Sequence, residues 1–181
     1  SEASELRWSV GSGSTPSNFS GPESDHTTGN GNYLFMESSQ GNLTENAYMT
    51  LPPIDLTGGK DPNIQFYYHM SGFFAGDGEI MLQASTDNGE SWETLFAREG
   101  PQSPNWQKAV VDLNQYSNET VVLRFEGIRN TQYNDYAIDD IQILQHDFVA
   151  ESYVGPKQPC NLTANENVIA SVKYTGLDTL N

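Results

Sequence analysis

Short runs in which apolar and polar residues alternate make up most of the chain between residues 33 and 145. In the run EIMLQAS at residues 79–85, for example, Ile80, Leu82 and Ala84 share one face. Turn sequences such as Gly-Asn-Gly, Gly-Asp-Gly and Asp-Asn-Gly separate the runs. Period-two alternation with closely spaced turns is typical of antiparallel β-sheets packed as a sandwich. Because no segment shows a sustained 3.6-residue period, we expect an all-β fold with little helix.

The pattern changes near residue 146. The segment ESYVGPKQP at residues 151–159 has the composition of a linker, and the residues after it have the pattern strand, turn, strand. A segment of about 35 residues is too short to bury a core of its own. The sequence therefore predicts one domain over residues 1–146, followed over residues 147–181 by a linker and part of a neighbouring domain. The alternative is a tail that packs back onto the sandwich, because apolar strands need partners.

The chain is strongly acidic, with 24 Asp and Glu against 8 Lys and Arg, and its net charge is −16. This charge makes nucleic acid and anionic membrane surfaces unlikely partners and favours cations, although it also serves solubility. We find no run of the kind that inserts into a membrane and no signal-like segment. Cys160 is alone and cannot form an internal disulfide.

Several motifs occur in a fixed order along residues 6 to 145: GPESDHTTGNGNYLFMESS, QFYYHMSG, NWQKAVVDL, VVLRFEGI and DYAIDDIQI. DHTTGNGNY resembles the Asp-His-Thr-x-Gly-x-Gly signature of MAM domains, and FYYHMSG and AIDDI resemble two further signatures of that family. MAM domains are extracellular modules of metalloproteases, receptor phosphatases and neuropilins. The resemblance implies a jelly-roll sandwich of two antiparallel sheets and a non-catalytic adhesion or recognition role.

The resemblance also implies a setting and a set of partners. A secreted or cell-surface location is expected, with a glycan or an extracellular protein as the ligand and neighbouring domains in the same chain. Two alternatives stay open, namely a self-associating structural module and a carbohydrate-binding module attached to a secreted hydrolase or protease. The stretch lacks the paired cysteines of animal MAM domains, and this cysteine-free form is similar to modules of secreted bacterial proteins.

Four carboxylates are candidate ligands for calcium. Asp25 precedes a Gly-rich turn, where it can cap backbone N–H groups or bind a hard cation. Strict alternation would place Asp139 and Asp140 on opposite faces of a strand, so that one of them faces the interior or the rim. Jelly rolls of related fold hold calcium between an early loop and the last strand, which adds Glu37 to the set. The alternative is that loop amides and hydroxyls satisfy these carboxylates.

Neither histidine in the motifs points to catalysis. His26 has no recognisable nucleophile motif to serve, and we expect it to join its loop to the sheet by packing and hydrogen bonds. His69 lies in an aromatic strand and should pack there. Asp139 and Asp140 do not face one cleft as a glycosidase pair would. We therefore do not expect an enzyme.

Exposed aromatic rings are the candidate ligand contacts, because a ring face matches the apolar face of a sugar. Phe73 and Phe74 lie near a turn, where one of them has to leave the core. Tyr133 and Tyr136 belong to a polar stretch that has the character of a recognition loop. Trp106 precedes a core strand and is expected to pack instead.

The stretch STDNGESW at residues 85–92 fits the Asp-box pattern Ser-x-Asp-x-Gly-x-x-Trp. In that pattern the Asp and Gly shape a hairpin and the Trp packs beneath it. Asp-Asn-Gly is itself a strong hairpin signal. We expect a structural hairpin here rather than a ligand contact.

Overall fold

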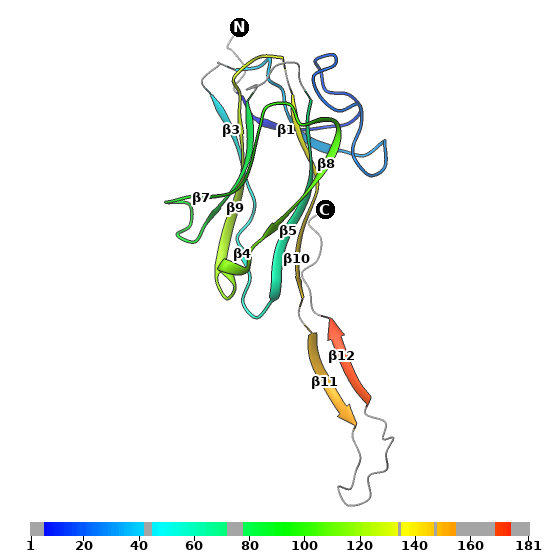
Figure 1. The fold of residues 1–181 in the computed structure, drawn as a ribbon, viewed down its shortest axis with the longest axis vertical. Coiled ribbons are helices and arrows are strands. Elements are labelled where there is room, and N and C mark those ends of the chain that lie inside the picture. Colours follow the sequence, from blue (N-terminus) through cyan, green and yellow to red (C-terminus); the bar gives the residue numbers. More distant parts are fainter. Residues whose placement is uncertain are drawn as a thin grey trace, which may run out of the picture.

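The computed structural model describes residues 6–41, 45–71, 78–133, 135–146, 148–154 and 169–174. These residues form two antiparallel sheets that pack face to face, with a two-stranded ribbon beyond them (Figure 1). The predicted all-β jelly-roll sandwich is therefore confirmed. Within the described ranges no helix has the length and apolar character needed to cross a membrane.

The first sheet has the strand order β1-β2-β10-β5-β8. Its strands are β1 (Trp8–Gly11), β2 (Tyr33–Met36), β10 (Tyr136–His146), β5 (Lys60–Met70) and β8 (Ser103–Asp112). The second sheet has the order β3-β9-β6-β7, and the short β4 also pairs with β9. Its strands are β3 (Asn46–Thr50), β9 (Thr120–Ile128), β6 (Glu79–Ser85), β7 (Glu93–Glu99) and β4 (Ile54–Asp55). A 3-10 turn, η1 (Asn114–Tyr116), follows β8.

The core fills the space between the two sheets and follows the predicted alternation. Phe66 of β5 and Phe125 of β9 are fully buried, and their rings meet edge to face with centroids 4.9 Å apart. Phe96 of β7 makes a second edge-to-face contact with Phe66 at 5.3 Å. Such pairs contribute about 0.5–1.5 kcal/mol each beyond their area burial. Aromatic residues from three strands thus tie the two sheets together.

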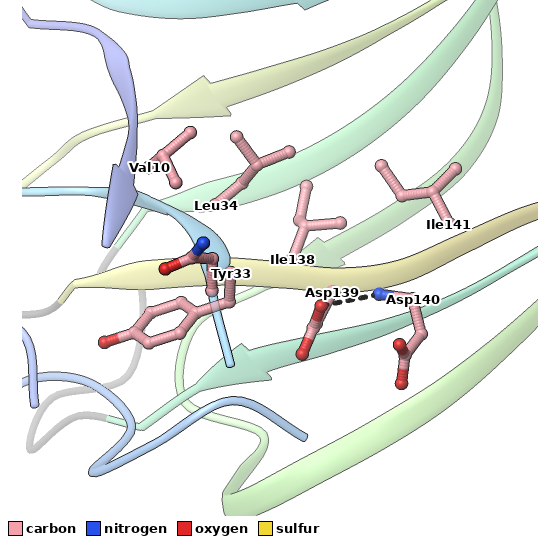
Figure 2. A pocket seen from close by; sticks show the side chains of 8 residues that line it. Val10, Tyr33, Leu34, Ile138, Asp139, Asp140 and Ile141 are labelled. Carbon is pink, nitrogen blue, oxygen red and sulfur yellow. Dashed lines mark hydrogen bonds between the residues drawn. The ribbon is translucent and has the colours of Figure 1, made fainter. Parts of the chain in front are cut away.

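A β-bulge interrupts the alternation in β10. Asp139 lies opposite Tyr67 and Gln142 lies opposite Gln65, so β10 has one residue more than β5 over this step. Asp140 accommodates the extra residue with a left-handed φ of 49°. Figure 2 shows the result: Asp139 and Asp140 lie on the same side of the strand. The expectation that they point to opposite faces is wrong, because the bulge turns Asp140 outward.

The ribbon beyond the sandwich consists of β11 (Phe148–Val154) and β12 (Ile169–Tyr174), which pair antiparallel (orange and red in Figure 1). Residues 151–154, which we expected in a linker, are therefore part of a strand. The rest of that segment lies outside the described residues. The division into a domain over residues 1–146 and the start of another over 147–181 stays a prediction.

Candidate functional site

The loop at residues 24–31 is built around the carboxylate of Asp25. Asp25 Oδ2 accepts hydrogen bonds from the backbone N–H and the hydroxyl of Thr28, at 2.8 and 2.9 Å, and Oδ1 accepts one from the N–H of Gly31 at 2.7 Å. These bonds, that from the Thr28 N–H above all, lower the pKa of Asp25 against the opposing effect of burial. Asp25 thus shapes its own loop, which agrees with the alternative in which amides and hydroxyls satisfy it.

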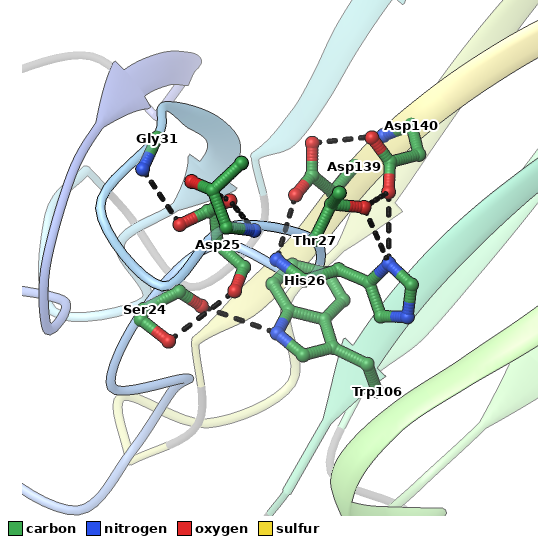
Figure 3. Close-up of polar contacts among 9 residues, drawn as sticks. Ser24, Asp25, His26, Thr27, Gly31, Trp106, Asp139 and Asp140 are labelled. Carbon is green, nitrogen blue, oxygen red and sulfur yellow. Dashed lines mark hydrogen bonds and ion pairs between the residues drawn. The ribbon is translucent and has the colours of Figure 1, made fainter.

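The next two residues attach the loop to the bulge in β10 (Figure 3). The backbone N–H of His26 donates to Asp139 Oδ2 at 2.8 Å. His26 Nδ1 lies 2.8 Å from Asp140 Oδ2, which also accepts a hydrogen bond from the Thr27 hydroxyl. Two carboxylates on the outside of the strand therefore hold two consecutive loop residues.

Aromatic contacts complete this attachment. The His26 ring stacks on Tyr67 of β5, with centroids 3.4 Å apart and ring planes 19° apart. Trp106 of β8 meets the His26 ring edge-on at 6.3 Å, and its indole N–H donates to the Ser24 carbonyl at 3.1 Å. The predictions that His26 joins the loop to the sheet and that Trp106 packs are confirmed.

His69 is packed in the same sheet, as predicted. Its exposed fraction is 2%, and its Nε2–H donates to the Pro104 carbonyl at 3.0 Å. Burial lowers the pKa of His69, and the bond to Pro104 opposes this shift. A buried imidazole that bonds to a backbone carbonyl and packs against the Trp106 ring is a structural element of the sheet.

Two shallow hollows flank His26 on the outer face of the first sheet. The first has a volume of about 300 Å³ and lies over β5, β8 and β10. The second, of about 410 Å³, lies on the Trp106 side between the loop and the start of β8. A third hollow of about 380 Å³ lies where β1 ends and β2 begins, beside the bulge (Figure 2). The pinned loop thus shapes the exterior of this sheet.

A buried pair of carboxylates lies apart from the loop. Glu37 Oε1 accepts hydrogen bonds from the hydroxyls of Ser17 and Ser39 at 2.6 and 2.8 Å, whereas the buried Oε2 has no hydrogen-bond partner in the described part of the chain. Asp135 accepts bonds from the Ser38 N–H at 2.9 Å and the Ser20 hydroxyl at 2.6 Å. The exposed fractions of Glu37 and Asp135 are only 4% and 1%.

Burial raises the pKa of Asp135, and the charge of Glu37 raises it further, while hydrogen bonds from Ser20, Ser38 and Thr15 oppose the rise. The structure therefore places two acidic groups in almost complete burial. Sequence reasoning missed Asp135, although its position just before the last strand of the sandwich resembles the positions of the acids that were proposed.

Arg129 lies near this pair but binds carbonyl oxygens. Its guanidinium donates to the carbonyls of Ser38, Gln40 and Gly41. Among the described residues no ion pair joins a cationic side chain to Glu37 or Asp135. The charge of the two carboxylates is thus not neutralised by a side chain in that part of the chain.

The structure does not assemble the four expected calcium ligands. Asp25, Asp139 and Asp140 lie close to one another, but N–H and O–H donors occupy their oxygens, except for Oδ1 of Asp140. Glu37 has Asp135 as its acidic neighbour instead. Over the described residues, no three acidic, histidine or cysteine side chains form a group that could hold a metal. The bulge accounts for the difference, because it sends both strand carboxylates to the loop.

The aromatic residues proposed as ligand contacts differ in their exposure to solvent. Tyr133 is 54% exposed, as a ligand contact requires. Tyr136 is 2% exposed and packs in the core as the first residue of β10, so its assignment to an exposed recognition loop is wrong. Phe73 and Phe74 lie outside the described residues.

The Asp box forms the predicted hairpin between β6 and β7. Asp87 accepts hydrogen bonds from the hydroxyls of Ser85 and Ser91 and from the Ser91 N–H. The Trp92 indole N–H donates to the Gly89 carbonyl at 3.1 Å. The motif is a turn stabilised by hydrogen bonds within itself.

Comparison with known proteins decides the family. Residues 1–147 match the family described as MAM domain, meprin/A5/mu. This chain belongs to the MAM-domain family. It is 34% identical over 137 residues to MAM domain-containing protein 2 of Mus musculus, which covers 75% of this chain and 19% of that protein. It is 32% identical over 149 residues to Neuropilin-1a of Danio rerio, covering 81% of this chain and 16% of that protein.

The chain thus spans less than a fifth of these two relatives. Among solved structures, the K2 cleaved adhesin domain of Lys-gingipain superposes with a TM-score of 0.50 and 17% identity, covering 76% of this chain and 82% of that domain. At that identity the likeness concerns the fold alone. The resemblance to MAM domains inferred from the motifs is confirmed.

Proposed function

We propose that this MAM domain is a non-catalytic recognition or adhesion module that acts outside the cell as part of a longer, secreted or cell-surface protein. The observation that carries the proposal is the outer face of the first sheet, where rigid strands and a pinned loop hold polar side chains around shallow hollows. The family membership supports it, since relatives of this chain include zonadhesin and neuropilin. A cysteine-free form of bacterial origin is part of the same proposal.

The test is retention of the labelled chain on cultured cells and on extracellular matrix. Saturable retention is expected for the folded chain, and unlabelled chain should compete for it. The same chain after heat denaturation is the control. A recognition role would be contradicted if the folded chain is retained neither on the cells nor on the matrix.

Self-association is a second candidate function, and the open edge of β10 favours it. β2 pairs with Tyr136–Ile138 of β10, and among the described strands none pairs with the next residues of β10 on that side. The hollow beside them includes Val10, which is 69% exposed, and the apolar side chains of Leu34 and Ile141. A second copy could cover this apolar edge.

Sedimentation velocity over a range of concentrations tests this second function. Val10→Lys should then abolish the dimer, whereas Val110→Lys, at a 59% exposed position on β8, should leave it intact. A wild-type chain that sediments as a monomer at every concentration would exclude self-association.

A bound calcium ion completes the proposal, with Glu37 and Asp135 as its carboxylate ligands. The support is the buried, unpartnered Oε2 of Glu37 beside a second buried carboxylate, because an uncompensated buried charge is costly. Calcium prefers carboxylate, hydroxyl and carbonyl oxygens, and the hydroxyls of Ser17 and Ser20 already contact the pair. The ion would neutralise the two carboxylates and so stabilise the fold.

Thermal unfolding and calorimetric titration, in calcium and in EDTA, test the ion. At a calcium concentration of about 100 times Kd the wild type should gain about 2.7 kcal/mol of stability. Glu37→Gln should abolish this gain, and Asp140→Asn, in the originally expected ligand set, should retain it. Loss of the gain in Asp140→Asn alone would place the ion at the loop instead. An unchanged wild type in EDTA would exclude calcium at either place.

A further inference from the structure

One hollow on the outer face of the first sheet has the chemistry of a ligand site. It lies beside the stacked rings of His26 and Tyr67 and has a volume of about 300 Å³. Apart from these rings, polar side chains line it: Thr27, Gln65, Lys108, Asp140 and Gln142. None of the candidates drawn from the sequence, except Asp140, pointed to this place.

The strands hold these side chains in a fixed arrangement. Lys108 of β8 lies directly beside Tyr67 of β5, and Gln142 of β10 lies beside Gln65 of β5. All four therefore project from the same face of neighbouring strands. The bulge brings Asp140 to the same hollow, since it turns this carboxylate outward.

Several polar groups in the hollow have no partner within the described part of the chain. The Lys108 ammonium, the Gln142 amide, the Tyr67 hydroxyl and Oδ1 of Asp140 form no hydrogen bond there. In contrast, Oδ2 of Asp140 is held by His26 and Thr27. The Asp140 carboxylate is therefore oriented by one oxygen and offers the other, which is the arrangement of a prepared acceptor.

The charges of the hollow select among ligands. One ammonium and one carboxylate face the same space, so an anionic or a cationic ligand would meet repulsion as well as attraction. An uncharged ligand with many hydroxyl groups meets an acceptor in Asp140, a donor in Lys108, and groups that both donate and accept in Gln65 and Gln142. The ring of Tyr67 adds apolar surface for the C–H groups of such a ligand.

We propose that this hollow binds a sugar unit of a neutral glycan. The inference rests on the proposed recognition function and names its ligand class and its site. Its ligand contacts are Gln65, Tyr67, Lys108, Asp140 and Gln142. The loop at residues 24–31 serves the site by fixing Asp140 and Tyr67 through His26.

The experiment is an NMR titration of the ¹⁵N-labelled chain. The probes are neutral oligosaccharides of glucose, galactose and mannose, with an oligogalacturonate and a sulfated oligosaccharide as charged comparisons. We expect at least one neutral oligosaccharide to shift the side-chain amide signals of Gln65 and Gln142. Gln142→Ala and Lys108→Met should each weaken its binding about tenfold, the effect of losing one or two hydrogen bonds.

Lys60→Met is the matched control, because Lys60 is an exposed lysine at the far end of β5 and outside the hollow. It should leave the affinity unchanged. The inference is overturned if no neutral oligosaccharide shifts the two Gln signals, or if only the charged probes do so. A chain that is retained on cells with equal affinity in the wild type and in Lys108→Met would keep the recognition function and overturn the glycan site.

Discussion

The backbone N–H of His26 donates a 2.8 Å hydrogen bond to Oδ2 of Asp139, which lies 113 residues further along the chain. This bond connects the Asp-His-Thr-Thr stretch to the Ile-Asp-Asp stretch of β10, two of the motifs that point to the family. Each motif is therefore half of one device that pins a loop to a sheet. Asp139, Asp140 and His26 therefore serve to attach the loop to the sheet.

Asp139→Asn tests this attachment. The Asp139 carboxylate accepts one hydrogen bond from the N–H of His26 and one from the N–H of Asp140. Asparagine can accept only one of these bonds, because its amino group is a donor and would face the other N–H. Burial raises the pKa of Asp139, so removing its charge also relieves a cost, and we expect a net loss of only about 1 kcal/mol. Exchange of the His26 amide hydrogen should accelerate markedly.

Glu90→Gln is the control, since Glu90 is exposed and forms no hydrogen bond in the described part of the chain. It should change neither the stability nor the exchange of the His26 amide. If the His26 amide is equally protected in Asp139→Asn, the bond to Asp139 does not hold the loop.

Asp87 of the Asp box should make the fold sensitive to acid. Hydrogen bonds from Ser85 and Ser91 lower the pKa of Asp87 below its ordinary value of 3.8. A carboxylate whose pKa is lower in the folded state stabilises the fold above the unfolded-state pKa, and this contribution is lost as the pH falls below it. The stability of the wild type should therefore decline between about pH 5 and pH 2.

Denaturant unfolding at several pH values measures this decline. Asp87→Asn cannot titrate and loses the carboxylate oxygen that accepts the bond from the Ser91 hydroxyl, so it should be less stable at neutral pH and decline less steeply in acid. Glu90→Gln should follow the wild-type curve. Parallel curves for Asp87→Asn and the wild type would show that Asp87 contributes nothing to acid sensitivity.

The fold could be predicted because its determinants are local. Alternation along each strand decides which residues enter the core, and Phe66 and Phe125 are buried as their strands require. The Asp-Asn-Gly turn specifies its hairpin within eight residues. Signals of this kind depend only on neighbouring residues in the sequence and not on the tertiary structure.

The site could be predicted only in part because its determinants are tertiary. The bulge at Asp140 depends on how β10 matches β5, and the alternation rule gave Asp139 and Asp140 opposite faces. Tyr136 was assigned to a loop because polar residues precede it, although β10 begins there. Asp135 could not be recognised as a candidate from the sequence, because its acidic neighbour Glu37 is distant along the chain and comes close only in the fold.

Gly78 should be the least replaceable glycine among those with positive φ. Its φ is 71°, and a Cβ at this position would overlap the Tyr136 hydroxyl and the Ile128 carbonyl. Gly29 has a similar φ of 76°, but no atom lies within 4 Å of the position of its Cβ. Gly29→Ala therefore measures backbone strain alone, about 1–2 kcal/mol, whereas Gly78→Ala adds a clash and should cost more than 3 kcal/mol.

Thermal unfolding of the two alanine variants, side by side, measures this difference. A low yield of folded Gly78→Ala together with a normal yield of Gly29→Ala agrees with the clash. Equal losses of Tm in the two variants would show that the space around Gly78 is not limiting.

Arg129 should matter more to stability than any exposed arginine. Its guanidinium is buried and donates to the carbonyls of Ser38, Gln40 and Gly41, which joins the end of β9 to the segment after β2. Arg129→Met leaves three carbonyl groups without this donor, and we expect a loss of about 3 kcal/mol. Arg129→Lys keeps the charge but lacks the planar fork, so its loss should be intermediate.

Arg98→Met provides the comparison for Arg129→Met. Arg98 is exposed and stacks on Phe96 at 4.5 Å, and within the described part of the chain its hydrogen bond goes to the adjacent Ala97 carbonyl. Its replacement should cost about 1 kcal/mol or less. Unfolding in guanidinium chloride measures the free energy of unfolding of all three variants. We expect the largest loss in Arg129→Met, an intermediate loss in Arg129→Lys and the smallest loss in Arg98→Met. If Arg129→Lys loses as little as Arg98→Met, the three carbonyls need only a nearby charge, and the fork geometry of Arg129 is dispensable.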